Sequence, residues 1–267
     1  MGGGSLQIAF ATDGNTEGVD PSNLAKFNLG SHGKELEYSL FVTTHLGFGA
    51  NVALSKHINS IKENSPSNSA QGKYIMFSRY MKLYNVCKIP NFLWKNRDLD
   101  YSSNPEFSDP CFPSGFVSNI DDLDILGVGD WSACTELLRP LLNKTGCSRD
   151  SNTCSLDASF QPSLAGTKDF FGFSEFYYTS EDTLKIAGIW DYERFRSKAS
   201  EYCATDWSDL QTNWKNKMYK ADENRLKNQC FKSAWVSVKE STLKSLVNFF
   251  FSWCYMKDSI FLKLEKS

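Results

Sequence analysis

The sequence predicts a mixed α/β fold for this chain of 267 residues. Apolar and polar residues alternate over residues 35–44, which is typical of a strand with one buried face. A stripe of apolar residues with helical spacing follows almost at once, over residues 50–63. No internal repeat or collagen-like period is present. Strands and helices are therefore expected to be interspersed, as in an α/β domain rather than a helical bundle.

The first elements follow from short local patterns. A strand is expected at residues 7–12 (QIAFAT), directly after the glycines at 2–4. The second strand, at 35–44, is joined to it by a turn-rich stretch, so the two are expected to form a hairpin with a long loop. The run LGFGAN at 46–51 predicts a tight exit from the second strand into the helix at 50–63.

The later elements are less regular. Residues 64–110 are polar and irregular, with an aromatic island at 74–84. A helix is expected at 132–143, with Pro140 disturbing its last turn. The aromatic run at 170–179 predicts a buried strand whose phenylalanines lie in the core. Further helices are expected at 180–187, 192–203 and 223–238.

Composition restricts the kinds of partner. The chain is 41% hydrophobic and 14% aromatic, which indicates a globular protein with a real core. Its net charge is −2, which gives no electrostatic case for a nucleic-acid partner, where a basic stripe would be expected. We therefore expect no nucleic-acid partner.

The cysteines indicate an oxidising compartment. There are eight, with no C-x-x-C pair and only three histidines, so a zinc site is not expected. Disulfides fit better, although eight cysteines allow about 105 pairings and the sequence alone does not choose among them. A sequon at Asn143 predicts glycosylation. No signal peptide is visible and the apolar patch at 246–256 is too short to span a bilayer, so we expect the natural N-terminus, and any membrane anchor, to lie outside this chain.

The glycine-rich start is the first candidate site. Gly2, Gly3, Gly4 and Ser5 run into the first strand and resemble a phosphate cradle, because glycines let backbone N–H groups approach an anion. Taken alone, the same residues equally suit a cloning linker.

Sequence motifs farther along the chain support the interpretation of the glycine-rich start as a phosphate-binding loop. The stretch GGGSLQIAF resembles the D-[LM]-G-G-A-S-T-Q-I-x-F block of the apyrase (nucleoside triphosphate diphosphohydrolase) family. Other blocks follow in the family's order at 23–30 (NLAKFNLG), 46–51 (LGFGAN), 109–113 (DPCFP), 129–131 (GDW), 171–178 (FGFSEFYY), 202–205 (YCAT) and 229–235 (QCFKSAW). The wording of the GFSEFYY and QCFKSAW blocks is most similar to the Golgi and lysosomal uridine-diphosphatase branch.

The resemblance implies two actin-like (RNase H-like) lobes, of which this chain would hold the second, C-terminal one, incompletely. Nucleotide and a divalent cation, Mg²⁺ or Ca²⁺, would lie between the lobes. Gly2, Gly3 and Gly4 would bind phosphate, and Ser5 and Gln7 would hold the attacking water. Neither side chain is basic enough to deprotonate that water, so a carboxylate elsewhere must act as general base.

The resemblance also assigns the base pocket and the disulfides. Tyr178 would stack on the nucleotide base, with Glu175 near the same pocket. The disulfides would be Cys111–Cys134, Cys147–Cys154 and Cys203–Cys230, leaving Cys87 and Cys254 unassigned. No residue of this chain is assigned to the metal.

Several family features are absent, and they limit the expected activity. The family's aspartate before the glycines, its first phosphate loop and its catalytic glutamate have no counterpart in these residues. Leu6 replaces a threonine. The lobe is expected over 1–238, with an insertion at 74–98, and 239–267 is expected to be a divergent tail.

Three functions follow from these observations. The first is a fragment of a Golgi or other lumenal nucleoside di-/triphosphatase acting on UDP or GDP, inactive without its N-terminal lobe and anchored to the membrane only through the absent termini. The second is a non-catalytic nucleotide-binding or protein-interaction lobe. The third is a secreted, disulfide-braced binding domain, which leaves the ordered blocks unexplained.

Overall fold

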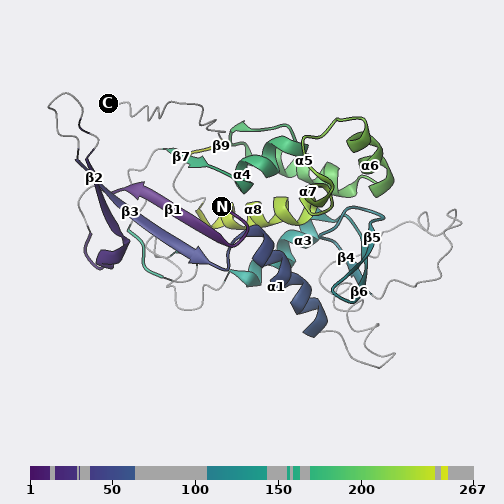
Figure 1. Ribbon diagram of the computed structural model, residues 1–267, viewed down its shortest axis with the longest axis horizontal. Helices are drawn as coiled ribbons and strands as arrows, with labels where there is room; N and C mark the ends of the chain where they lie inside the picture. The colour runs from purple at the N-terminus through teal and green to yellow at the C-terminus, as the bar shows by residue number, and fades with distance from the viewer. Residues whose placement is uncertain are drawn as a thin grey trace, which may run out of the picture.

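A computed structural model of the chain describes residues 1–12, 16–28, 30, 37–63, 107–142, 155–156, 159–162, 169–243 and 248–251. Its strands form three small sheets of three strands each, and helices lie among them (Figure 1). Helix α8 (Gln229–Leu243) runs through the middle, where it contacts α1, α3, α5 and α7. The expected mixed α/β fold is confirmed.

The first sheet carries the N-terminal glycines. Strand β1 (Ser5–Ala11) pairs antiparallel with β3 (Glu37–Leu46), as expected, and β2 (Leu24–Asn28) pairs with the other edge of β3. A short 3₁₀ turn, η1 (Pro21–Asn23), precedes β2. Leu6, Ile8 and Phe10 alternate into the core while the residues between them face outward. Helix α1 (Ala50–Glu63) follows β3 within four residues.

The second sheet lies beside one of the disulfides. It contains β4 (Phe107–Asp109), β5 (Val117–Ile120) and β6 (Leu123–Gly127), in the order β4–β6–β5. Helix α3 (Trp131–Leu138) follows and is capped by Asp130, whose carboxylate accepts the Ala133 N–H. Cys111 and Cys134 join the loop after β4 to α3. One turn of 3₁₀ helix, η2 (Arg139–Leu141), then ends the segment.

The third sheet brings distant segments together. Strand β7 (Asp169–Gly172) pairs parallel with β9 (Asn248–Phe251), and β8 (Gly188–Ile189) pairs antiparallel with β9. Between β7 and β8 lie α4 (Glu175–Tyr178) and a π-helical turn, η3 (Thr179–Thr183).

The remaining helices complete the core. They are α5 (Tyr192–Ala204), α6 (Trp207–Lys215) and α7 (Glu223–Lys227). The Cys203–Cys230 disulfide joins α5 to α8. Phe195, Phe231 and Trp235 are fully or almost fully buried here. Two of the three disulfides implied by the resemblance are therefore formed, and Cys147, Cys154, Cys87 and Cys254 lie outside the described residues.

Three sequence-based expectations about elements were wrong. The aromatic run is not a buried strand, because β7 ends at Gly172 and the chain turns at Ser174, where φ is +59°. Phe171 and Phe173 are 58% and 51% exposed, and β7 lies at the edge of its sheet. The helix expected at 180–187 is only the π-helical turn, which ends before Lys185, where φ is +54°.

Two other helices differ in extent. The helix expected at 223–238 is divided at Asn228 into α7 and α8. The helix expected at 132–143 becomes 3₁₀ from Arg139 onward, because Pro140 has no N–H to donate and restricts the preceding backbone. Strands β2, β4, β5 and β6 and helix α6 were not predicted.

The structure describes part of the segment that was expected to be a divergent tail. Helix α8 continues past residue 238 to Leu243, and β9 pairs with β7, so part of the expected tail belongs to regular structure. The insertion at 74–98, Asn143 and residues 252–267 lie outside the described residues, so the division into lobe and tail stays a prediction. Among the helices described, none is both long enough and apolar enough to cross a membrane.

Candidate functional site

The glycines before β1 form a loop that is held by the first turn of α1. The Ala50 N–H donates to the Gly2 carbonyl, and the N–H groups of Asn51 and Val52 both donate to the Gly3 carbonyl, at 3.0–3.1 Å. The Gly47 N–H donates to the Gly4 carbonyl at 3.0 Å. The first N–H groups of a helix have no partners within the helix, and here the glycine loop supplies acceptors for them.

These bonds orient the N–H groups of the loop. In a planar trans peptide, the carbonyl of one residue points opposite to the N–H of the next. The Gly2 and Gly3 carbonyls point toward α1, so the N–H groups of Gly3 and Gly4 point away from it. Within the described part of the chain, neither N–H has a hydrogen-bond acceptor. The loop thus presents two backbone donors on the side away from α1, which is an arrangement suited to an anion.

Ser5 and Gln7 lie next to each other on the outward face of β1. Leu6 between them is buried, which places both polar side chains on the opposite face. The Gln7 Nε2 donates to Ser5 Oγ at 2.6 Å. This pair begins at the end of the glycine loop, so the predicted phosphate and water ligands are contiguous.

The aromatic segment is tied to the glycine loop through Met1. The Glu175 N–H donates to the Met1 carbonyl at 3.0 Å, and the Met1 ammonium donates to the Phe173 carbonyl at 3.4 Å. The Glu175 carboxylate is itself held by Lys232 of α8 at 3.0 Å, with both side chains mostly buried. The structure therefore brings the two predicted regions together and engages Glu175 in an ion pair with α8.

Tyr178 is half-buried and has a cation beside its ring. The Arg225 guanidinium lies 4.5 Å from the ring centroid, and its Nη1 donates to Asp182 Oδ2 at 2.6 Å. Burial raises the pKa of the Asp182 carboxyl, and the hydrogen bond and charge of Arg225 oppose that rise. Tyr178 thus has an Arg225 guanidinium packed against its ring and Tyr177 edge-on beside it.

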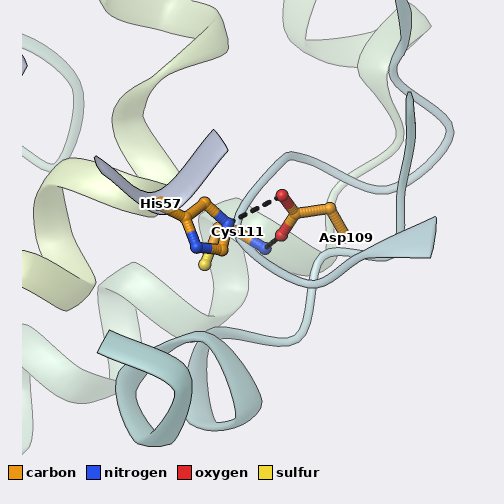
Figure 2. Close-up of side chains that lie close together, drawn as sticks. All are labelled: His57, Asp109 and Cys111. Carbon is orange, nitrogen blue, oxygen red and sulfur yellow. Dashed lines mark hydrogen bonds and ion pairs between the residues drawn. The ribbon is translucent and has the colours of Figure 1, made fainter. Parts of the chain in front are cut away.

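A second polar group lies buried between α1 and β4 (Figure 2). His57 Nε2 and Asp109 Oδ2 are 2.8 Å apart, and Asp109 Oδ1 accepts the Cys111 N–H at 2.8 Å. Both side chains are almost fully buried. Among the described residues, His57, Asp109 and Cys111 are the one group of three potential metal ligands that lie close together. The Cys111 sulfur is bonded to Cys134, so it offers no thiolate to a metal.

Sequence reasoning missed several of these residues. The sequence did not indicate the roles of Arg225 and Lys232, because each is more than forty residues away in the sequence from the carboxylate that it contacts. Gly49 and Asn51 stood within the LGFGAN block, but the block did not show that they pack against the glycine loop. His57 and Asp109 are 52 residues apart in the sequence, so no local pattern indicated that they pair.

Comparison with known proteins identifies the family of this chain. Residues 1–240 match the GDA1/CD39 (nucleoside phosphatase) family. The chain is 34% identical over 253 residues to ectonucleoside triphosphate diphosphohydrolase 7 of Xenopus tropicalis, and the match covers 88% of this chain and 37% of that protein. It is 33% identical over 252 residues to human ectonucleoside triphosphate diphosphohydrolase 4, covering 88% and 36% of the two chains.

A fungal relative extends the comparison. The chain is 32% identical over 240 residues to the Golgi apyrase of Schizosaccharomyces pombe, covering 88% of this chain and 36% of that protein. The chain thus spans a little over a third of the length of these relatives. Its two disulfides indicate folding in an oxidising compartment. From the glycine loop through α8, this chain belongs to the GDA1/CD39 family of nucleoside phosphatases.

Proposed function

We propose that this chain is the C-terminal part of a nucleoside di-/triphosphate phosphohydrolase that releases phosphate from UDP- or GDP-type nucleotides. The observation that carries the proposal is the glycine loop, whose Gly3 and Gly4 N–H groups lack acceptors among the described residues and point away from α1. Backbone donors held in this way stabilise negative charge without reorganising during the reaction. The family match, to nucleoside phosphatases, supports a nucleotide substrate.

Ser5 and Gln7 are the proposed ligands of the attacking water. They are joined at 2.6 Å and face outward directly beyond the loop, so a water held by them would lie beside a phosphate bound there. Hydrogen bonds position the water but do not deprotonate it at neutral pH. A carboxylate elsewhere must therefore act as general base, and we propose that the N-terminal lobe supplies it.

Tyr178 is the proposed support for the nucleotide base. Its ring is half-buried and its segment is tied to the glycine loop through Met1. Stacking on a base contributes about 1–3 kcal/mol and requires little of the base's identity. Glu175 is the weaker of the two assignments, because Lys232 already holds its carboxylate.

The resemblance implies a divalent cation, Mg²⁺ or Ca²⁺, and both ions prefer oxygen ligands. Among the described residues, the one cluster of three potential ligands does not suit these ions, because it pairs His57 with Asp109 and closes Cys111 in a disulfide. No step of the reaction is therefore assigned to a cation held by these residues.

The proposed location is the Golgi or another lumen of the secretory pathway, with membrane anchoring through parts of the protein outside this chain. The disulfides support an oxidising compartment. One relative is a Golgi apyrase by name. The proposed partner is the N-terminal lobe that would complete the cleft.

The test compares phosphate release from UDP, GDP and ATP by this chain and by a form reconstructed with the family's N-terminal lobe. The reconstructed form should hydrolyse nucleotide and this chain alone should not. Ser5→Ala and Gln7→Ala in the reconstructed form should each lower kcat about 100-fold with little change in KM. Ser118→Ala, on β5 in the second sheet, is the matched control and should leave kcat unchanged.

Two results would contradict the proposal. Hydrolysis by the isolated chain would overturn the division of the site between two lobes. A reconstructed form that folds but releases no phosphate would end the proposal of an enzyme. Nucleotide binding without hydrolysis in that form would favour the alternative, a non-catalytic nucleotide-binding or protein-interaction lobe.

A further inference from the structure

The first turn of α1 packs unusually closely against the glycine loop. Gly49 precedes α1, and its carbonyl accepts the Ala53 N–H, so it occupies the N-cap position. A Cβ added to Gly49 would lie 2.3 Å from the Gly3 carbonyl carbon and oxygen and 2.4 Å from the Gly4 nitrogen. These are backbone atoms, which cannot move aside as the end of a flexible side chain can. Any side chain at residue 49 would therefore displace the peptide group that joins Gly3 to Gly4.

A second contact acts on the same loop from the first turn of the helix. A Cβ added to Gly3 would lie 2.7 Å from Asn51 Nδ2 and 3.2 Å from Asn51 Cγ, but 3.7 Å from Asn51 Cβ. The last distance is an ordinary van der Waals contact. The space around Gly3 is thus limited by the Asn51 amide rather than by the backbone of α1.

The lack of room for a Cβ, rather than the backbone conformation, explains why glycine occupies positions 3 and 49. The glycines with positive φ include Gly47, at +81°, but Gly3 and Gly49 are not among them. An alanine could adopt the backbone angles of either residue without left-handed strain. Substituting them with alanine therefore tests the packing alone.

We propose that Gly49 is a positioning residue, which sets the direction of the Gly3 and Gly4 N–H groups by fixing the loop against the first turn of α1. This inference rests on the proposed function, in which those two N–H groups bind phosphate. Gly49 permits the close approach that allows the Ala50, Asn51 and Val52 N–H groups to reach the Gly2 and Gly3 carbonyls.

The experiment uses the ¹⁵N-labelled full chain and four variants: Gly49→Ala, Gly3→Ala, Asn51→Ala and the double variant Gly3→Ala/Asn51→Ala. Amide hydrogen exchange measures the bonds to the loop, and titration with inorganic phosphate measures binding through the chemical shifts of the backbone amides at positions 3 and 4. Protection of the buried amides of α8 controls for folding in every variant.

The proposal predicts a particular pattern. Gly49→Ala should expose the Asn51 and Val52 amides to exchange and weaken phosphate binding at least 10-fold, with α8 still protected. Gly3→Ala should weaken binding less than Gly49→Ala, because the Asn51 amide that the new Cβ meets is the end of a side chain that can move aside. Asn51→Ala in the same chain should restore binding to within about 3-fold of Asn51→Ala alone, because it removes the atoms that the new Cβ would meet.

Two results would overturn the proposal. They are Asn51 and Val52 amides that exchange freely in the unaltered chain, and a Gly49→Ala variant that keeps both protection and binding. If the unaltered chain does not bind phosphate, the proposed function fails for the isolated chain. Amide exchange in Gly49→Ala then still decides whether Gly49 positions the loop: exposed Asn51 and Val52 amides support the proposal, and protected ones refute it.

Discussion

Replacing His57 with leucine should destabilise the protein markedly, because it removes one partner of a buried polar pair. His57 Nε2 lies 2.8 Å from Asp109 Oδ2, and the two side chains are 5% and 1% exposed. Leucine keeps an apolar group near the Phe231 ring, which lies 5.8 Å from the imidazole. Asp109 Oδ2 would then remain buried without this donor.

The expected size follows from what Asp109 retains. Leaving a buried polar group without its partner costs about 1–3 kcal/mol, and more when that group is charged. Asp109 keeps the Cys111 N–H at its other oxygen, so we expect a cost near the top of that range. We expect a loss of about 3 kcal/mol, or about 6–12 °C in Tm for a domain of this size.

His45→Leu is the matched control. His45 is also buried, but its Nε2 contacts the neutral Ser155 hydroxyl at 2.9 Å. A typical hydrogen bond contributes about 0.5–1.5 kcal/mol, less than one made to a charged group. A smaller loss in His45→Leu than in His57→Leu would therefore agree with a specific cost at the Asp109 carboxylate.

Urea unfolding of oxidised protein, followed by far-UV circular dichroism and tryptophan fluorescence, measures both losses. The double variant His57→Leu/Asp109→Leu should recover part of the stability, since no buried carboxylate is left. It should not recover all of it, because the Cys111 N–H then loses its acceptor. A His57→Leu loss below about 1 kcal/mol, or no larger than that of His45→Leu, would refute the reasoning.

Three further predictions concern the helices around α8. The buried Tyr202 hydroxyl donates to the Leu226 carbonyl at 2.8 Å, and burial raises the pKa of Tyr202. Stability should therefore fall as the pH rises past about 10, because the tyrosine ionises first in the unfolded chain. Tyr202→Phe should lose about 1 kcal/mol at pH 7 and flatten that alkaline decline, unlike Tyr38→Phe, in urea titrations from pH 7 to 11. The raised pKa of Asp182 contributes stability that is complete below about pH 3.8 and is lost as pH rises through the folded-state pKa. Arg225→Leu should steepen this loss of stability between pH 4 and 7, because Arg225 opposes the rise in the Asp182 pKa. An unchanged dependence of stability on pH would contradict this prediction. Removing the Cys203–Cys230 disulfide with paired serines should cost about 3.5 kcal/mol from its 27-residue separation, and an unchanged urea midpoint would exclude that contribution.

The sequence predicted the parts of the fold that depend on local pattern. Alternation placed β1 and β3 to within about two residues, and helical spacing gave both ends of α1. Each of these elements has one buried face, so the spacing of its apolar residues along the sequence shows the type of element. The prediction for the aromatic run at 170–179 was wrong because apolar composition alone does not show which residues are buried. The sequence does not show that β7 lies at the edge of its sheet or that Phe171 and Phe173 are exposed.

The candidate site divides in the same way. The sequence by itself determined that Gly2–Gly4, Ser5 and Gln7 are contiguous, because they are adjacent along one strand and its preceding loop. Only the tertiary structure decided which way the Gly3 and Gly4 N–H groups point, since their direction is set by bonds from α1, some fifty residues away. It likewise decided that Lys232 engages Glu175 and that Arg225 lies on Tyr178. Such contacts depend on how distant segments pack, and no local periodicity records them.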